Sequence, residues 1–218
     1  MKFFLIIKQD SVRVPNKNFL KLGRNSLWEI MVKKLINQSI FIDTDSNNVL
    51  QKCKKRYKNI IAYKRHVEHI NLEISNSFGV SPVLLMIERF LDNYVKDENE
   101  IIITPHVTSP FISLSTILDA VSYLEGNFDS VQASIHHKEF CYFNGKPVNF
   151  DPSVVQKTQD LEPVIMGNGA FFIFTKKTFK KYNNRTGSNP YFYPLSNIEG
   201  FEIDYPEDFE LARKINKN

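Results

Sequence analysis

The sequence predicts a three-layer α/β fold, in which a largely parallel β-sheet lies between two layers of helices. Short apolar runs typical of buried strands alternate with amphipathic helical segments as far as Ile135. A hairpin signal then interrupts this alternation, which indicates an antiparallel element late in the chain. Polar loops follow several of the expected strands, at the edge where sheets of this kind bind ligands.

Five apolar runs are expected to form strands before that change: residues 2–7, 40–43, 59–63, 100–104 and 129–135. The segments between them have apolar side chains at helical spacing, which predicts helices at residues 26–36, 44–57, 80–95 and 113–126. Asp45 or Ser46 can serve as the N-cap of the second helix, and Gly126 ends the fourth. The stretch 64–76 is interpreted as a polar connection.

The rest of the chain is expected to begin with a β-hairpin at residues 140–150, with Asn144 and Gly145 as its two-residue turn. Four further elements are expected after it: a buried strand at 169–175, a short helix at 176–182, a short strand at 201–204 and a helix at 206–215. Pro206 suits the first turn of that last helix.

The composition is that of an ordinary globular protein, with 42% hydrophobic and 24% charged residues among 218. The sequence contains no linker, repeat or low-complexity tract, so a single domain over residues 1–218 is expected. The first apolar run is too short for a signal peptide or a membrane span, which favours a cytoplasmic protein without membrane contact. Cys53 and Cys141 are therefore expected to be free thiols.

The formal net charge is +4, and the densest basic cluster lies at residues 52–58 on a predicted helix. Such a cluster is usually the solvated face of the helix. The sequence contains no recognisable nucleic-acid-binding module, so nucleic acid is not an expected partner. A basic interaction surface on this helix remains an alternative.

The loop after the first strand, residues 8–18, combines cations with hydrogen-bond donors. Lys8, Arg13 and Lys17 concentrate positive charge, and Ser11 and the backbone amides add donors. A triphosphate needs this combination, because charge-assisted hydrogen bonds are about twice as strong as neutral ones. Neither a Walker motif nor a Gly-x-Gly-x-x-Gly fingerprint is present. The residues alone therefore leave open a phosphate-binding loop or a solvated loop.

Near the C-terminus, Glu202 and Asp204 stand two positions apart in the expected strand 201–204. Residues i and i+2 of a strand point to the same side, so the two carboxylates are expected on one face. Converging carboxylates repel each other unless a cation lies between them, and Mg²⁺ typically takes one or two carboxylates together with water and phosphate oxygens. The pair predicts an Mg²⁺ site or, equally, the polar face of an edge strand.

Two further turns contain polar side chains that can hydrogen-bond a ligand. Thr108 and Ser109 follow the fourth strand and so reach the same sheet edge as the opening loop. Asn168 precedes the strand at 169–175, and Gly169 beside it permits close backbone approach. Each of these features is also typical of an ordinary tight turn.

Seven motifs occur in the order found in the acylneuraminate cytidylyltransferase family: KQDSVRVPNKNFLKLG, IDTDS, HVTSPFI, DSVQAS, KTQDLEP, NGAFFIF and NPYFYPLSNIEGFEIDYPEDFELA. The resemblance to this family covers nearly the whole chain. It implies a Rossmann-like sheet of the nucleotide-diphospho-sugar transferase type, with a hairpin insert at about residues 136–165 that joins two subunits. It also implies an enzyme that couples CTP to a nine-carbon, sialic-acid-like (nonulosonic) sugar acid with Mg²⁺ and releases pyrophosphate, for surface glycan synthesis.

The resemblance further implies which residues act. The contacts to CTP are Lys8, Ser11, Arg13, Lys17, Asn18 and Arg65. The catalytic residues are Lys8, Lys17 and Asp204. The sugar-binding residues are His106, Thr108, Ser109, Gln159 and Asn168, with Lys138 and Lys157 reaching the sugar carboxylate from the other subunit of a homodimer. The metal ligands are Glu202 and Asp204.

Three positions depart from the family pattern. Lys8 stands where many members have Arg, Val12 where Lys or Glu is usual, and Glu202 where the acidic pair begins with Asp. These departures keep open a catalytically weak or inactive homologue that binds the nucleotide or the sugar. A CMP-KDO synthetase, from a more distant branch of similar enzymes, is a less favoured alternative.

Overall fold

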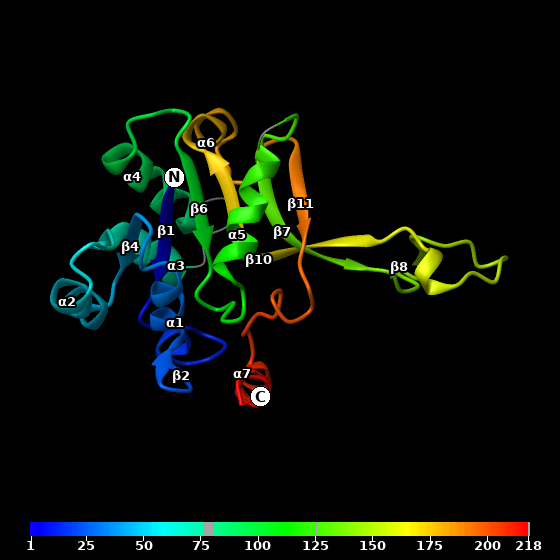
Figure 1. Ribbon diagram of the computed structural model, residues 1–218, viewed down its shortest axis with the longest axis horizontal. Coiled ribbons are helices and arrows are strands. Elements are labelled where there is room, and N and C mark those ends of the chain that lie inside the picture. The colour runs from blue at the N-terminus through cyan, green and yellow to red at the C-terminus, as the bar shows by residue number, and fades with distance from the viewer. Residues whose placement is uncertain (76–80, 125, 218) are drawn as a thin grey trace.

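The computed structural model describes residues 1–75, 81–124 and 126–217. Its centre is a seven-stranded sheet in the order β11-β7-β10-β6-β1-β4-β5 (Figure 1). The strands are β1 (Lys2–Ile7), β4 (Ile40–Thr44), β5 (Ile61–Lys64), β6 (Ile101–Pro105), β7 (Ser130–His137), β10 (Val164–Thr175) and β11 (Pro190–Pro194). All run in one direction except β10, which is antiparallel to β6 and β7. The predicted mostly parallel, Rossmann-like sheet is therefore confirmed.

Helices cover both faces of this sheet (Figure 1). They are α1 (Leu27–Lys34), α2 (Asn47–Arg56), α3 (Val67–Ser75), α4 (Pro82–Tyr94), α5 (Leu114–Val121) and α6 (Lys176–Tyr182). Helix α7 (Pro206–Ile215) lies beyond one end of the sheet (Figure 1), where Ala212 packs with Leu22 and Leu27. The alternation of side chains along β1 explains the two apolar layers. Phe3 belongs to the same buried cluster as Trp28 of α1, whereas Phe4 stacks on Phe90 of α4 with ring centroids 4.4 Å apart. The predicted three-layer arrangement follows from this alternation.

Local sequence signals set several element boundaries. Glu29 Oε2 accepts a hydrogen bond from the Ser26 amide at 3.1 Å, which forms a capping box at the start of α1. Asn144 and Gly145 have φ of 50° and 74°, as a two-residue hairpin turn requires, so the predicted turn is confirmed. Ser46 is the N-cap residue of α2, but its hydroxyl accepts no hydrogen bond from the helix amides and instead donates to Gln9 Oε1 at 2.6 Å.

Several features of the secondary structure differ from the prediction. The strand expected at 169–175 begins at residue 164, so Asn168 and Gly169 lie within β10 and not in a turn before it. The stretch 64–76 contains α3, whose apolar side chains are only partly covered and give a weak helical pattern. Residues 201–204 form no strand, because the amide of Ile203 donates to the Thr108 carbonyl and that of Asp204 to a carboxylate. Strand β11 has a proline at each end, which argues against a strand in the sequence but is tolerated at a sheet edge.

Parts of the predicted elements lie outside the described residues. These parts are residue 76 of the polar connection, residue 80 at the start of the third predicted helix and residue 125 near the end of the fourth. Among the described residues, no helix is long and apolar enough to cross a membrane. Cys53 and Cys141 are both free thiols, as predicted.

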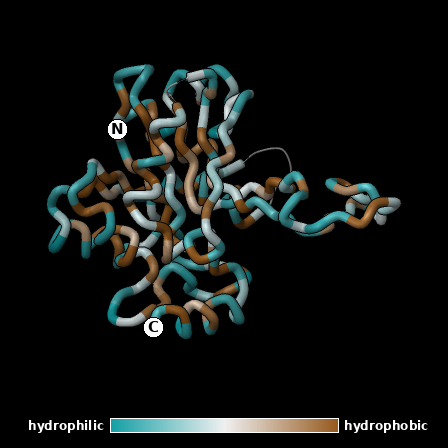
Figure 2. The backbone as a smooth tube through the Cα atoms, turned by 45° about the vertical axis from the view of Figure 1, so that its right-hand side comes forward, coloured by the Kyte–Doolittle hydropathy of each residue, from teal (hydrophilic) through white to brown (hydrophobic). Residues whose placement is uncertain are grey.

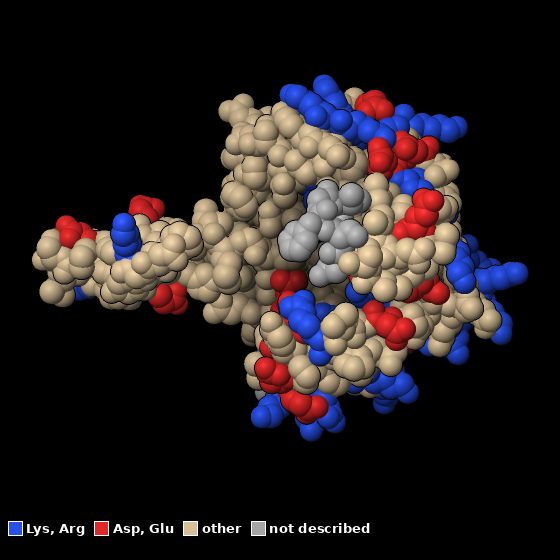
Figure 3. Space-filling view, turned by 180° about the vertical axis from the view of Figure 1, so that it is seen from behind, with Lys and Arg blue, Asp and Glu red and all other residues tan. Residues whose placement is uncertain are grey.

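Between β7 and β10 the chain leaves the body of the molecule as an arm, residues 138–163 (Figure 1). The arm contains the hairpin strands β8 (Tyr142–Phe143) and β9 (Lys146–Pro147). Hydrophobic segments lie along it (Figure 2), and Phe143 and Val155 are 71% and 104% exposed. From behind, the arm presents mainly uncharged surface, whereas Lys and Arg alternate with Asp and Glu over the body (Figure 3).

Candidate active site

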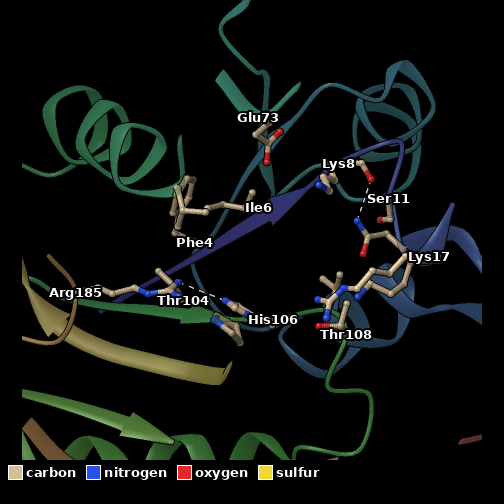
Figure 4. Close-up of a pocket in the computed structure, with 15 residues that line it drawn as sticks. Phe4, Ile6, Lys8, Ser11, Lys17, Glu73, Thr104, His106, Thr108 and Arg185 are labelled. Atoms are coloured by element: carbon tan, nitrogen blue, oxygen red, sulfur yellow. Dashed lines mark hydrogen bonds between the residues drawn. The ribbon is translucent and has the colours of Figure 1, made fainter. Parts of the chain in front are cut away.

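A cavity of about 390 Å³ lies beyond the carboxyl ends of β1 and β6 (Figure 4). Six parts of the chain line it: strand β1, the opening loop after it, helix α3, helix α4, the end of β6 with the residues that follow, and the loop between α6 and β11. The lining residues with polar side chains are Lys8, Ser11, Arg13, Lys17, Asn18, Glu73, Thr104, His106, Thr108 and Arg185. The cavity therefore lies at the sheet edge that the sequence predicts for ligand binding.

Hydrogen bonds hold the opening loop, residues 8–18, in a closed shape. Asn18 Nδ2 donates to the Lys8 carbonyl at 2.9 Å and so joins the two ends of the loop. Asn16 has a φ of 53°, a left-handed conformation that asparagine tolerates, and it precedes the 3₁₀ turn η1 (Lys17–Phe19). Lys17 and Asn18 of this turn are buried, which fixes the positions of the Lys17 ammonium and the Asn18 amide.

Two cations of the opening loop meet a carboxylate from the far end of the chain. Arg13 Nη2 and Lys17 Nζ donate to Asp204 Oδ1 at 2.8 and 3.0 Å, and Lys17 Nζ also donates to the Ile203 carbonyl at 2.7 Å. Among the residues that the structure describes, the Lys8 ammonium and the Ser11 hydroxyl have no hydrogen-bond partner. These two groups are available to a ligand in the cavity.

Glu202 lies beside Gly169 of β10. Its Oε2 accepts a hydrogen bond from the Gly169 amide at 3.0 Å. A Cβ atom at position 169 would stand 2.6 Å from Glu202 Oε1, so only glycine allows this approach. Burial raises the pKa of Glu202, and the neighbouring Asp204 carboxylate acts in the same direction.

Glu202 and Asp204 can supply ligands for a divalent cation. Glu202 Oε1 and Asp204 Oδ2 have no hydrogen-bond donor within the described part of the chain. The described part of the chain contains no group of three or more His, Cys, Asp or Glu residues that could hold a metal by itself. Mg²⁺ does not need such a cage, since it keeps several waters and takes substrate phosphates beside one or two carboxylates. The pair fits Mg²⁺ on this chemistry.

Two of the predicted site residues are buried and hydrogen-bonded within the protein. Arg65 is not among the cavity-lining residues: its Nε and Nη1 donate to Asp43 Oδ1 and Glu73 Oε2, both at 2.7 Å. Arg65 is linked to the cavity through its hydrogen bond to Glu73, whose side chain lines the cavity. Asn168 donates through Nδ2 to the Gly200 carbonyl at 2.8 Å and accepts from the backbone at 2.9 Å through Oδ1.

The remaining predicted residues divide between the cavity and the arm. Thr108 lines the cavity, whereas Ser109 is buried beside it with a hydroxyl that has no partner in the described ranges. Lys138, Lys157 and Gln159 lie on the arm, outside the cavity lining. There, Lys138 Nζ donates to the Gln159 carbonyl at 3.1 Å.

His106 lines the cavity in the neutral state. Burial, followed by the nearby cation of Arg185, lowers the pKa of His106 to about 3. Arg185 Nη1 lies 3.4 Å from His106 Nε2, and a guanidinium can only donate, so Nε2 accepts and Nδ1 holds the ring proton. Nδ1 lies 3.0 Å from the point where a Cβ on Gly169 would stand.

Three polar residues of the cavity carry no signal in the sequence. Glu73 lies in the stretch interpreted as a polar connection, and Thr104 is the last residue of an apolar run. Arg185 lies in a loop between α6 and a strand that the sequence does not reveal. Only the packing of α3 and β11 brings Glu73 and Arg185 to the cavity.

Comparison with known sequences identifies relatives of this chain. The sequence model of the cytidylyltransferase family matches residues 7–218. The N-acylneuraminate cytidylyltransferases of Streptococcus agalactiae serotypes III and Ia are each 24% identical to it over 216 residues. These alignments cover 93% of this chain and 50% of each relative, so the chain spans about half the length of the curated relatives it matches.

Solved structures share the fold. A CMP:2-keto-3-deoxy-manno-octonic acid synthetase complexed with CTP has a TM-score of 0.64 at 11% identity, covering 98% of this chain and 96% of its own. The 2-C-methyl-D-erythritol 4-phosphate cytidylyltransferase of Francisella tularensis has a TM-score of 0.65 at 13% identity, covering 98% of both chains. Identities this low show the fold alone, whereas the family match extends over almost the entire sequence. The chain belongs to the cytidylyltransferase family.

Proposed function

We propose that this chain transfers a cytidylyl group from CTP to a hydroxyl group of a sugar acid and releases pyrophosphate. The main support is the meeting of two cavity-lining cations of the opening loop, Arg13 and Lys17, with the Asp204 carboxylate. Membership of the cytidylyltransferase family supports CTP as the donor.

In the proposed reaction, the hydroxyl oxygen of the acceptor attacks the α-phosphorus of CTP and loses its proton. The bond from that phosphorus to the oxygen bridging to the β-phosphate breaks, and pyrophosphate leaves with the bonding electrons. Negative charge grows on the phosphate oxygens during this step, so preorganised cations stabilise the transition state. Lys8 and Lys17 act in this way, with Ser11, Arg13 and Asn18 as further contacts to the triphosphate and ribose.

Asp204 has two parts in this proposal. Its carboxylate holds Arg13 and Lys17 in one place, which orients the loop cations before the nucleotide arrives. With Glu202 it also supplies oxygen ligands for Mg²⁺, which would neutralise charge on the phosphate oxygens when bound. Arg65 does not line the cavity, and its part in this proposal is to hold Glu73 at the cavity wall through a hydrogen bond.

The proposed acceptor is a nine-carbon nonulosonic acid of the sialic-acid type, used for surface glycan synthesis. The names of the curated relatives support this class. His106 and Thr108 offer polar groups to the sugar in the cavity, and Ser109 and Asn168 shape the wall behind them. A 2-keto-3-deoxy sugar acid of eight carbons is the second candidate, because the CTP-bound synthetase with the same fold acts in the synthesis of such a CMP-sugar.

We further propose that the arm joins two copies of the chain. Phe140, Tyr142, Val154 and Val155 are exposed and line one groove of the arm, and contiguous exposed apolar surface of this kind marks interaction sites. Lys138, Lys157 and Gln159 lie outside the cavity of their own chain, so they can serve a sugar-binding site only in the partner subunit. The arm therefore has both a dimerising and a substrate-binding part in this proposal.

The direct test is pyrophosphate release with CTP, Mg²⁺ and a panel of N-acetylneuraminic, legionaminic and pseudaminic acids and KDO. Release with one acid that EDTA abolishes is expected. Asp204→Asn is expected to lower kcat/KM at least about 100-fold, because it removes a metal ligand and the anchor of two cations. Glu207→Gln, on an exposed residue of α7, is the matched control and should change little.

The competing hypothesis is a catalytically weak or inactive homologue, which Val12 and Glu202 favour. A CTP titration of the same folded sample separates the two. CTP affinity without pyrophosphate release from any acid in the panel would contradict the proposed reaction and favour the binding protein.

A further inference from the structure

Arg185 is a cavity-lining cation that forms no ion pair in the described part of the chain, although the Glu202 carboxylate is near enough to raise its pKa. Arg185 lies in the loop between α6 and β11, and its guanidinium lies over the ring of Phe172, 3.5 Å from the centroid. Its one hydrogen bond is the 3.4 Å contact to His106 Nε2, and no carboxylate in the described ranges lies within ion-pair distance of it. Arg65, the other arginine deep in this part of the molecule, is paired with two carboxylates. A guanidinium has five N–H donors, so most of those on Arg185 are unused.

The surroundings of Arg185 fix its direction. Because His106 is neutral and accepts through Nε2, it orients one edge of the guanidinium without cancelling its charge. The ring of Phe172 covers one face. Burial lowers the pKa of Arg185 to about 10 against the opposing effect of the Glu202 carboxylate, so the group keeps its charge at neutral pH. A fixed, charged and largely unpaired guanidinium at a cavity wall is a recognition group for an anion.

Thr104 supplies a second, independent observation at the same end of the cavity. It is 2% exposed and lines the cavity, and its hydroxyl has no partner among the described residues. A buried hydroxyl without a partner costs free energy unless a ligand satisfies it. Figure 4 shows Thr104 and Arg185 together at one end of the cavity, with His106 beside them.

The nucleotide phosphates have cations of their own elsewhere in the cavity. Lys8, Ser11 and Lys17 lie at the opposite end from Arg185, with the apolar side chains of Phe4 and Ile6 on the wall between the two ends (Figure 4). An anion at the Arg185 end therefore belongs to the second substrate rather than to the triphosphate.

The charge at this end favours a carboxylate over a phosphate ester. Among the described residues that line this end, Arg185 is the one cation, and Phe4 and Phe172 make its surroundings apolar. A carboxylate has one negative charge and accepts two parallel hydrogen bonds from a guanidinium. A phosphate monoester carries nearly two charges at pH 7, and the second would remain buried without a counter-ion.

We propose that Arg185, oriented by His106 and assisted by the Thr104 hydroxyl, binds the carboxylate of the acceptor sugar acid within the same chain and so selects acids as acceptors. This inference rests on the proposed function, which it deepens. It places the specificity for the acid in the cavity's own chain, whereas the family resemblance assigns the carboxylate to lysines of the partner's arm. The lysines then contribute to other parts of the acceptor.

The test measures equilibrium binding by calorimetry in the presence of CTP and absence of Mg²⁺, so that turnover is not required. The probes are N-acetylneuraminic acid, its carboxamide, KDO and 2-C-methylerythritol 4-phosphate. The proteins are the wild type and the variants Arg185→Gln, Arg185→Lys and Thr104→Val, with Arg24→Gln on an exposed residue as the control. Circular dichroism shows whether each variant is folded, and CTP affinity is measured for each variant in parallel.

The wild type is expected to bind one of the acids, and Arg185→Gln to bind it about 100-fold more weakly, because a desolvated charged pair is lost. Arg185→Lys is expected to fall between them, since it keeps the charge but loses the fork. Thr104→Val should weaken binding about 3- to 10-fold. The carboxamide should bind the wild type weakly and be almost indifferent to Arg185→Gln, while CTP affinity stays within about threefold in all variants.

Four results would overturn the proposal: equal binding of acid by wild type and Arg185→Gln, an equal loss of CTP affinity, binding of neither acid by the wild type, or Arg185-dependent binding of the phosphate ester instead. Pyrophosphate release tests the proposed function separately. Arg185-dependent binding of an acid without release under Mg²⁺ would retain this proposal and reject cytidylyl transfer. Release with an acid that does not depend on Arg185 would do the reverse.

Discussion

Replacing Arg65 with methionine is expected to destabilise the protein strongly, because it leaves two carboxylates without their shared cation. The guanidinium and the Asp43 carboxylate are both 0% exposed, and each hydrogen bond from Arg65, to Asp43 and to Glu73, is 2.7 Å long. After the substitution, the nearest cation to Asp43 is Arg89, 3.9 Å from the other carboxylate oxygen. Methionine fills similar space, so the loss is mainly electrostatic.

The expected cost is about 3–5 kcal/mol, the usual result of removing one partner of a buried ion pair. For a domain of this size, each kcal/mol lowers Tm by about 2–4 °C, so a decrease of about 6–20 °C is expected. Thermal unfolding followed by circular dichroism, with urea unfolding for the free energy, measures it. Arg56→Met, on an exposed residue of α2, is the matched control and should change Tm little.

The pH dependence of stability in Arg65→Met is a second measurement of the same electrostatic loss. Burial raises the pKa of Asp43 and the charge of Arg65 opposes that rise, so the pKa is higher still in Arg65→Met. A carboxyl group with a raised pKa in the folded state binds its proton more readily there, so its destabilising effect fades as pH falls. The difference in stability between wild type and variant should therefore shrink between pH 7 and pH 5. A cost below about 1 kcal/mol, or one that grows on acidification, would refute this account.

Three further predictions concern the site and the arm. Gly169→Ala places a Cβ 2.6 Å from Glu202 Oε1, so kcat should fall about tenfold. Adding Glu202→Asp, whose side chain is one methylene shorter, should recover part of the lost kcat. A double variant with no recovery would contradict the steric cause. The pKa of His106 is about 3, against about 6.5 in the unfolded chain, so this residue makes the protein less stable as pH falls below about 6.5. His106→Gln should therefore reduce the loss of unfolding free energy between pH 7 and pH 5, measured by urea titration. An unchanged loss would argue against this role of His106. Phe143→Glu on the arm should convert a dimer to a monomer in sedimentation velocity, whereas a dimer that persists would exclude this part of the arm as the contact.

Elements with strong local patterns could be predicted from the sequence. In β1, Phe3 and Phe4 alternate between the two apolar layers, and a run of this kind is recognisable without any tertiary contact. The Asn144-Gly145 turn is similarly local, because glycine and asparagine adopt positive φ more readily than other residues. The elements that were not predictable depend on their neighbours: α3 lies half-covered on the surface, and β11 is a strand because β7 offers it an edge.

The candidate site also combines features that the local sequence predicts with features that depend on tertiary contacts. The charge and donor content of the opening loop is a local property, and so are the acidic side chains of Glu202 and Asp204. The expected arrangement of that pair on a strand was wrong, since residues 201–204 form none. Neither carboxylate lines the cavity, but Asp204 binds Arg13 and Lys17, which do. Hydrogen bonds to Thr108 and Gly169, rather than a strand ladder, position the segment that holds the pair.

By itself the sequence determined the alternation of strands and helices, the late hairpin and the cationic loop, because each follows from residues close together in the chain. Only the tertiary structure decided which charges meet. Lys17 and Asp204 are 187 positions apart and share a hydrogen bond, and Arg65 turns away from the cavity to a buried aspartate. Arg185 reaches the cavity from a loop without any motif. Ion pairing and burial depend on distances in space, which no local pattern of residues contains.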